Sequence, residues 1–237
     1  MYKRILLKLS GEALAPVEGK QNLDVDCLSS LAQVIKKLHD NGQQIGVVVG
    51  AGNIWRGKLA DEIGIERVPA DFMGMLGTVI NAVALSSALK KLGVSTKVYS
   101  AIHEIPGVCE LYDKDDANKY LNNNVVCFFA GGIGKPYFTT DTAAAQRALE
   151  TNCEAIFMGK NGVDGIYDKD PLKYSDAKFF QTMTYDELFE KKLQVMDVSA
   201  VELVKDTNIE LRVFSMKDAN NFINVANGST IGTTVRR

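Results

Sequence analysis

Short apolar runs that end in glycine turns recur along this chain, and they constrain its fold more than any other feature. The first run covers residues 4–9 and is followed by Ser10-Gly11. Similar runs lead into Gly50-Ala51-Gly52, Gly131-Gly132 and Gly159. Such runs are typical of strands buried on both faces of a parallel sheet. The sequence therefore predicts an α/β protein whose ligands bind at the carboxyl ends of its strands.

The segments between these runs have helical periodicity. Asp24 is predicted to cap a helix that ends at Asn41-Gly42, and residues 71–92 carry apolar side chains at three- and four-residue steps. A strand, a helix and a second strand in this order imply parallel pairing through a right-handed crossover. Further helices are predicted over residues 113–121, after a capping box at Thr184, and after Asp197. Further strands are predicted over residues 94–99, 124–130, 155–158, 212–214 and 230–235. A hairpin is predicted near Asp164-Gly165.

The composition argues against several classes of function. The chain has 237 residues, a formal net charge of -2 and 24% charged residues, which favours neither a nucleic-acid partner nor a membrane surface. Its four cysteines form no C-x-x-C pair and its two histidines have no adjacent nucleophile, so we expect no protein metal site and no Ser-His or Cys-His hydrolase. We recognise no signal peptide and no apolar run long enough to span a bilayer, and expect a reduced, cytoplasmic protein.

Cations stand close to two of the predicted turns. Lys8 lies at the end of the first run and Arg56 follows Gly52. Backbone N–H groups of a glycine turn, together with a cation, can bind a phosphate. Lys8 could equally extend into solvent from a strand end. A dinucleotide fingerprint at Gly50 is not favoured, because Trp55 stands where its third glycine would be.

Residues 131–141 form an unusual segment before a helix rich in alanine. It is not a Walker A loop, because the spacing fails and Pro136 follows the lysine. The aromatic pair Tyr137-Phe138 could stack on a base and Thr139-Thr140 could hydrogen-bond its edge, although either threonine could simply cap the helix. Asp141 falls in the first helical turn, where the macrodipole stabilises its charge, and it can hold a nearby lysine.

Further along the chain, an aromatic and a carboxylate are again close in sequence. Tyr167 and Asp170 would suit a purine nucleoside, or they belong to ordinary turns.

Asp71 could cap a helix or accept a hydrogen bond from a sugar hydroxyl. Fixed N–H groups and cations around one point are what phosphoryl transfer requires, since the protein stabilises moving charge and does little covalent chemistry.

Five motifs make a family resemblance specific. They are residues 8–14, residues 47–53 with Arg56-Gly57, residues 71–76, residues 134–141, and Val163-Asp164-Gly165 with Val195-Met196-Asp197. With these motifs the chain resembles the bacterial-type UMP (uridylate) kinases of the amino acid kinase superfamily over almost its whole length. The resemblance implies a three-layer αβα sandwich with a mainly parallel central sheet and transfer of the γ-phosphoryl group of ATP to UMP. It also implies Mg²⁺ with ATP, a homohexamer, GTP and UTP as effectors, and one domain over residues 1–237, with UMP mainly on its N-terminal part and ATP mainly on its C-terminal part.

The resemblance also assigns roles to individual residues. Lys8, Arg56, Asp141 and Asp197 would be catalytic, and the two aspartates would position the lysine and the nucleotide. The residues expected to bind ATP are Lys8, Leu9, Ser10, Gly11, Gly52, Arg56, Asn161, Tyr167 and Asp170. The residues expected to bind UMP are Gly50, Ala51, Asp71, Ile133, Gly134, Lys135, Pro136, Tyr137, Phe138, Thr139 and Thr140, with Asp71 on the ribose.

Ala51 departs from the glycine that is frequent in this family, and its methyl group requires a negative φ. Two other classes stay open at this point. One is a superfamily relative that makes an acyl phosphate on an amino acid, against which the segment Tyr137-Phe138-Thr139-Thr140 argues. The other is a nucleotide-responsive binding protein without catalysis, against which Lys8, Arg56 and Asp141 argue.

Overall fold

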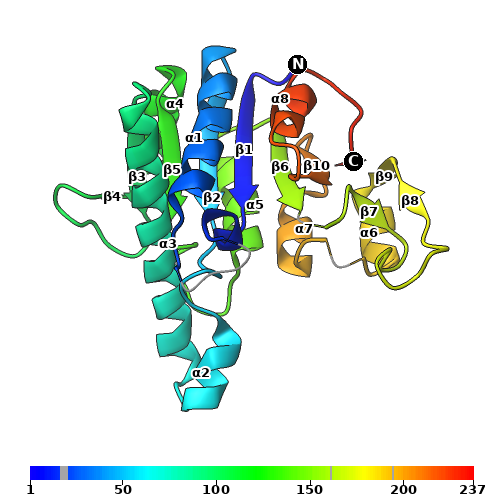
Figure 1. Cartoon of the computed structure of the whole chain (residues 1–237), viewed down its shortest axis with the longest axis horizontal. Coiled ribbons are helices and arrows are strands. Elements are labelled where there is room, and N and C mark those ends of the chain that lie inside the picture. The colour runs from blue at the N-terminus through cyan, green and yellow to red at the C-terminus, as the bar shows by residue number, and fades with distance from the viewer. Residues whose placement is uncertain (17–20, 161, 194) are drawn as a thin grey trace.

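A mainly parallel sheet forms the centre of the protein. The computed structural model describes residues 1–16, 21–160, 162–193 and 195–237. Within these residues, nine strands follow the order β4-β3-β5-β2-β1-β6-β10-β11-β9, and every neighbouring pair is parallel except β10 with β11 (Figure 1). The strands are β1 (Arg4–Leu9), β2 (Gln44–Val49), β3 (Thr96–Ser100), β4 (Glu110–Leu111), β5 (Val126–Ala130), β6 (Ala155–Lys160), β9 (Thr182–Thr184), β10 (Glu210–Ser215) and β11 (Thr233–Arg236). The remaining two, β7 (Ile166–Tyr167) and β8 (Phe179–Phe180), form a separate antiparallel hairpin.

Helices cover both faces of the sheet, which gives the predicted three-layer αβα sandwich (Figure 1). The first apolar cluster joins α1, α3 and α8 to one face, and the second joins α4, α5, α6 and α7 to the other. The helices are α1 (Val25–Asp40), α2 (Gly57–Ile63), α3 (Arg67–Lys91), α4 (Lys114–Asn122), α5 (Thr140–Glu150), α6 (Tyr185–Glu190), α7 (Val198–Val204) and α8 (Asn220–Ala226), with a 3₁₀ turn η1 (Gly11–Leu14).

The two faces of β1 explain its unbroken apolar run. Ile5 and Leu7 are buried in the cluster beneath α1 and α3, whereas Leu6 is buried in the cluster beneath α5 and α7. Successive side chains of a strand point to opposite faces, so a central strand must be apolar at every position. Lys8 shares the face of Leu6, and this orientation directs it toward α5.

Helix termini follow local capping chemistry. Asp24 caps α1 by accepting from the N–H groups of Asp26 and Cys27, as predicted. Thr184 and Glu187 form the predicted capping box of α6. These interactions depend only on neighbours in the sequence, which is why the sequence predicts them correctly.

Helix α3 begins earlier than predicted, and this changes the environment of Asp71. The helix starts at Arg67 with Glu66 at its N-cap position, so Asp71 lies beyond the first turn and is not a cap. Pro69 fits in that first turn, because the N–H group that proline lacks has no intrahelical partner there. Helix α2 was not predicted at all.

Helix α3 also has the length and composition of a membrane span, with a mean hydropathy of 1.6 over its most apolar window. By these two criteria, the expectation that no apolar run is long enough is wrong. Half of that window is buried inside the fold, and Val79, Ala82, Leu85 and Leu89 pack into the core beneath α1. The apolar composition of α3 is therefore accounted for by its packing.

Candidate active site

The turns that follow β1 and β2 touch each other. The N–H group of Gly50 donates to the carbonyl of Leu9 at 2.9 Å. A Cβ atom added to Gly11 would lie 2.3 Å from Oδ1 of Asn53 and 2.5 Å from the carbonyl oxygen of Gly50. Only glycine at position 11 therefore allows this approach. The side chain of Leu9 is 1% exposed and belongs to the core, so only its backbone faces the turns.

Lys8 and Asp141 form an ion pair at the end of β1. Nζ of Lys8 lies 2.7 Å from Oδ1 of Asp141, and both side chains are less than one-fifth exposed. Asp141 is in the first turn of α5, where the helix dipole favours its charge. The pair fixes the position of the ammonium group where the strand ends, because neither side chain can move freely at this burial.

Thr139 and Asp197 join α5 to α7. Oγ1 of Thr139 accepts from the N–H groups of Asp141 and Thr142 and so caps α5, while its hydroxyl donates to Asp197. Asp197 occupies the N-cap position of α7, but its carboxylate binds Thr139 rather than its own helix. Asp197 was predicted to cap α7. It does occupy the N-cap position, but its side chain makes no capping hydrogen bond to the helix.

Asp141 and Asp197 line a cavity of about 740 Å³ on the α6–α7 side of the site. Its walls are mainly apolar, with contributions from Leu188, Met196 and Val201. An apolar cavity with a few charged groups in its lining is typical of a site for a ligand that is part apolar and part charged.

Lys160 lines the same cavity, and the sequence analysis did not single it out. It is the last residue of β6, and Lys8 pairs in register with Met158, so Lys160 shares its sheet face with Lys8. Its Nζ donates to the carbonyl of Val195 at 3.1 Å. Burial, and secondly the charge of Lys8, lower the pKa of Lys160, while Asp141 partly opposes this shift. The sequence could not reveal this lysine because nothing in it shows that β6 lies beside β1.

A second cavity, of about 250 Å³, lies on the α3 side. Of the residues predicted to bind nucleotide, those that line it are Ala51, Gly52, Asp71, Phe138, Thr139 and Thr140. Gly52 was predicted to bind ATP and the other five to bind UMP. The predicted UMP-binding residues that do not line this cavity are Gly50, Ile133, Gly134, Lys135, Pro136 and Tyr137. The linings of the two cavities are adjacent at the start of α5, since Thr140 lines one and Asp141 lines the other.

Asp71 holds two groups beside this smaller cavity. Its carboxylate accepts from Nε of Arg67 at 2.8 and 2.9 Å and from the N–H group of Tyr137 at 2.7 Å. Tyr137 has a φ of 70°, in the left-handed region that non-glycine residues rarely adopt. Its bond to Asp71 stabilises that backbone conformation, and strained backbone of this kind concentrates at functional sites.

Arg56 lies at the entrance to the turns. Nη2 of Arg56 is 2.6 Å from Glu12, its Nε donates to the carbonyl of Gly52 at 3.0 Å, and its side chain is 67% exposed. Ser10 accepts from the N–H group of Glu12 and caps η1. Arg56 therefore stands near the predicted phosphate-binding backbone, in an exposed ion pair that a phosphate could exchange with.

Ala51 fits its turn for two reasons. Its φ is not positive, as its methyl group requires, because the non-glycine residues with positive φ in the described chain are Asn124, Tyr137, Asn152 and Lys192. Its methyl group also faces Gly77 of α3, where an added Cβ would lie only 2.8 Å from the Cβ of Ala51. The alanine is accommodated because the facing helix position has no side chain.

The predicted donor residues Tyr167 and Asp170 do not line either cavity. The hydroxyl of Tyr167 donates to Asp164, and its ring packs edge-on against Phe179. Asp170 accepts from the N–H group of Leu172 in a turn. The third predicted donor residue, Asn161, lies outside the described residues.

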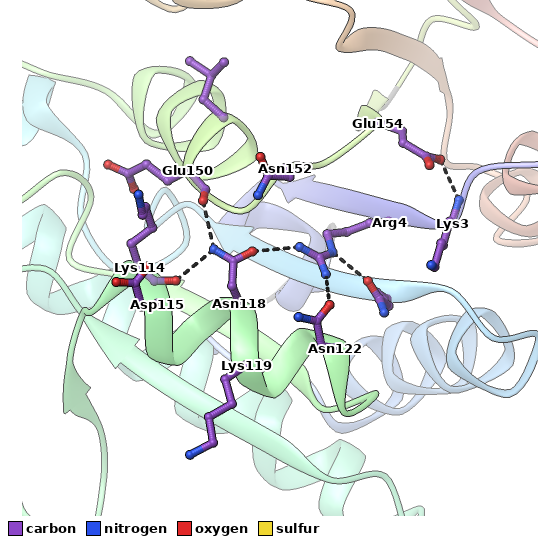
Figure 2. Close-up of a pocket in the computed structure, with 12 residues that line it drawn as sticks. Lys3, Arg4, Lys114, Asp115, Asn118, Lys119, Asn122, Glu150, Asn152 and Glu154 are labelled. Carbon is purple, nitrogen blue, oxygen red and sulfur yellow. Dashed lines mark hydrogen bonds between the residues drawn. The ribbon is translucent and has the colours of Figure 1, made fainter.

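A larger cavity, of about 960 Å³, lies at the amino ends of β1 and β2, and none of the predicted site residues line it (Figure 2). Figure 2 shows Arg4 at its centre. The guanidinium donates to Gln44, Asn118, Asn122 and the carbonyl of Thr151. These contacts use the hydrogen-bond donors of the Arg4 guanidinium within the protein, so Arg4 is not left free to bind a ligand in this cavity. A large volume therefore does not by itself identify the functional site.

Known proteins share both the sequence and this architecture. The amino acid kinase family matches residues 3–215. A uridylate kinase of Mycoplasmopsis synoviae is 48% identical over 236 residues, which cover 100% of this chain and 99% of that protein. Crystal structures of UMP kinases from Bacillus anthracis and Ureaplasma parvum, both 37% identical, superpose with TM-scores of 0.95 and 0.94 and cover 99% and 100% of this chain and 96% and 100% of theirs. The chain thus belongs to the amino acid kinase family and resembles, over its full length, that family's uridylate kinases.

Proposed function

We propose that this protein is a UMP kinase that transfers the γ-phosphoryl group of ATP to UMP and yields UDP and ADP. The observation that carries the proposal is the Lys8–Asp141 pair at the start of α5, where Asp141 lines the larger cavity and the preceding residue, Thr140, lines the smaller one. The larger, mainly apolar cavity suits the nucleoside of ATP, and the smaller one beside Asp71 suits UMP. This geometry would place the phosphates of both nucleotides between the glycine turns and the start of α5.

In this arrangement the protein stabilises charge and holds the reactants in line. Lys8 neutralises the charge that develops on the transferring group, and Asp141 keeps its ammonium in place. Lys160 adds a second cation on the ATP side, and Arg56 adds one at the turn of β2. Asp71 accepts hydrogen bonds from the ribose of UMP with lone pairs that Arg67 and Tyr137 leave available. The phosphate of UMP is itself the nucleophile, so no general base is needed.

Mg²⁺ would enter with ATP. Among the described residues no group of three or more His, Cys, Asp and Glu side chains is placed to hold a metal. Mg²⁺ commonly binds through one or two carboxylates together with substrate phosphates. Asp141 and Asp197, which line the larger cavity, are the carboxylates that fit this arrangement. The ion would neutralise phosphate charge there.

The assembly and regulation of the enzyme are part of the proposal. Val68, Phe72, Leu76 and Ile80 recur every four residues along α3 and are 37–51% exposed. An apolar stripe of this kind supports contact with a second copy of the chain. We propose a homohexamer in the cytoplasm that responds to GTP and UTP.

An acceptor panel tests the function. ADP release would be measured with UMP, CMP, dUMP, aspartate and acetylglutamate at fixed ATP and Mg²⁺. Release with UMP at least 10-fold faster than with any other acceptor is expected. Preference for an amino acid would support the acyl-phosphate alternative, and nucleotide binding without ADP release from any acceptor would support a binding protein.

A further inference from the structure

The turn after β5 is held from two sides by buried polar side chains that take no part in the proposed chemistry. The turn consists of Gly131, Gly132 and Gly134, with φ values of 75°, 60° and 77°. All three lie in the left-handed region, which costs glycine little and other residues much. The turn leads directly into residues 133–140, the segment expected to meet UMP, so its position fixes where that segment begins.

Thr78 of α3 holds the amide side of the turn. Its Oγ1 accepts from the N–H group of Gly131 at 2.8 Å and donates to the carbonyl of Met75 at 2.6 Å. Thr78 is only 7% exposed, so no water replaces these bonds easily. Its hydroxyl is fully committed to the protein, although the residue also lines the smaller cavity.

Arg147 of α5 holds the carbonyl side of the same turn. Its Nη2 donates to the carbonyl of Gly132 at 3.4 Å, and its Nη1 donates to Glu150. The guanidinium carbon lies 3.7 Å from the ring centroid of Tyr112, whose hydroxyl donates to the same Glu150. Arg147 is 4% exposed, and its guanidinium is held in place by stacking on Tyr112 and by the ion pair with Glu150.

The turn has almost no freedom to move relative to its neighbours. A Cβ atom on Gly134 would lie 2.4 Å from the carbonyl oxygen of Ala101, and one on Gly131 would lie 2.9 Å from the amide nitrogen of the same residue. The third side of the turn is therefore closed by backbone. With this wall in place, the two polar contacts from α3 and α5 hold the peptide groups on either side of the Gly131-Gly132 step, Thr78 at the N–H group of Gly131 and Arg147 at the carbonyl of Gly132.

We propose that Thr78 and Arg147 are positioning residues for the acceptor, because together they hold the N–H group of Gly131 and the carbonyl of Gly132 and so align residues 133–140 with the acceptor nucleotide. This inference rests on the proposed UMP kinase function. A displacement of a reacting group by about 1 Å can cost about 100-fold in rate. Neither side chain contacts the larger cavity, so ATP binding depends on them little.

The test is the isosteric variant Thr78→Val beside Thr78→Ser. Valine keeps the shape but leaves the N–H group of Gly131 without its acceptor, whereas serine keeps the hydroxyl. Thr78→Val is expected to lower kcat/KM for UMP by about 10- to 100-fold and to leave the ATP affinity, titrated without UMP, within about twofold. Thr78→Ser is expected to remain within about threefold of the wild type. Arg147→Lys keeps the positive charge but lacks the planar guanidinium that donates to two partners at once. It should also lower kcat/KM for UMP while leaving the ATP affinity nearly unchanged.

Ser86→Ala is the matched control, because Ser86 is a buried hydroxyl on the same helix that bonds Thr96, away from both cavities. It should leave both nucleotides unaffected. The inference is overturned if Thr78→Val stays within about threefold of the wild type with UMP, if ATP affinity falls equally, or if serine fails to restore activity. A wild-type enzyme that uses another acceptor would overturn the proposed function instead, and the same variants compared on that acceptor would then decide the positioning role.

Discussion

At the scale of single residues, the charges at the end of β1 dominate the proposed chemistry. Nζ of Lys8 and Oδ1 of Asp141 lie 2.7 Å apart, although the two residues are 133 positions apart along the chain. Lys160 adds a second cation on the same face of the sheet. Because these groups are partly desolvated, their charges act more strongly on a phosphate than exposed charges would.

The first prediction concerns Lys8. Lys8→Ala is expected to lower kcat by about 10²–10³-fold, or roughly 3–4 kcal/mol, because it removes a preorganised charge that matters most in the transition state. Lys8→Arg should also have a low kcat, since the planar guanidinium of arginine does not fit the place of a compact ammonium group beside a tight turn. Steady-state kinetics and thermal unfolding of both variants check this. Retention of more than about a tenth of the wild-type kcat in Lys8→Ala would rule out the transition-state role.

The second prediction concerns pH and Lys160. A lowered pKa means that Lys160 loses its proton at a lower pH than an ordinary lysine does. The charged form prevails below that pKa, so kcat/KM for ATP should fall as pH rises through it. Arginine stays charged throughout, so Lys160→Arg should shift this alkaline limb to higher pH. Identical alkaline limbs in the wild type and in Lys160→Arg would show that Lys160 does not control ATP use.

At the scale of elements, the packing of α3 against the turn of β2 decides which small residues are possible. Gly77 faces Ala51, and Asn81 of the same helix donates to the carbonyl of Gly50 at 2.7 Å. The helix therefore supplies both the space and a hydrogen bond for the turn. A glycine within a helix normally weakens it by about 1 kcal/mol, and here the close approach to Ala51 explains why Gly77 is present.

The third prediction follows from this contact. Gly77→Ala should destabilise the protein by about 1–3 kcal/mol, because its new methyl group would lie 2.8 Å from that of Ala51. Adding Ala51→Gly should recover most of the loss, which urea unfolding of the single and double variants would measure. Gly74→Ala, one turn earlier, is the control: its nearest contact would be 3.7 Å from Trp55, so it should be neutral or stabilising. Equal effects of the two alanine substitutions would contradict the packing argument.

At the scale of the whole molecule, the order of the sheet strands brings the site together. β1 lies between β2 and β6, so the turn of β2 and the end of β6 reach Lys8 from opposite sides. Helix α5 packs on one face of the sheet and contributes Asp141 from its first turn. The exposed stripe on α3 stands on the other face of the sheet, where it is available to a second copy.

The fourth prediction tests that stripe. Leu76→Glu and Ile80→Glu place charges on side chains that are each 51% exposed, so the fold of one chain should tolerate them. Burial of these charges between two copies would be costly, and the assembly should dissociate. Analytical ultracentrifugation of the variants checks this. Val25→Glu on α1, at a side chain 76% exposed, is the matched control, and an unchanged assembly in the α3 variants would exclude this face as an interface.

The sequence by itself determined the features that depend on neighbouring residues. The buried strands, the capping of α1 by Asp24 and the capping box at Thr184 follow from local pattern and local hydrogen bonding. The family motifs added the fold class, and because each motif is a contiguous stretch they also gave a set of site residues as predictions.

Only the tertiary structure decided what depends on which strands are neighbours. Lys160 reaches the site because β6 pairs with β1, and Asp71 turns from a helix cap into the partner of Tyr137 because α3 begins at Arg67. The sequence carries no local signal for either arrangement. Strand order and helix docking are set by the burial of apolar surface over the whole chain, so residues far apart in sequence meet only once that burial is complete.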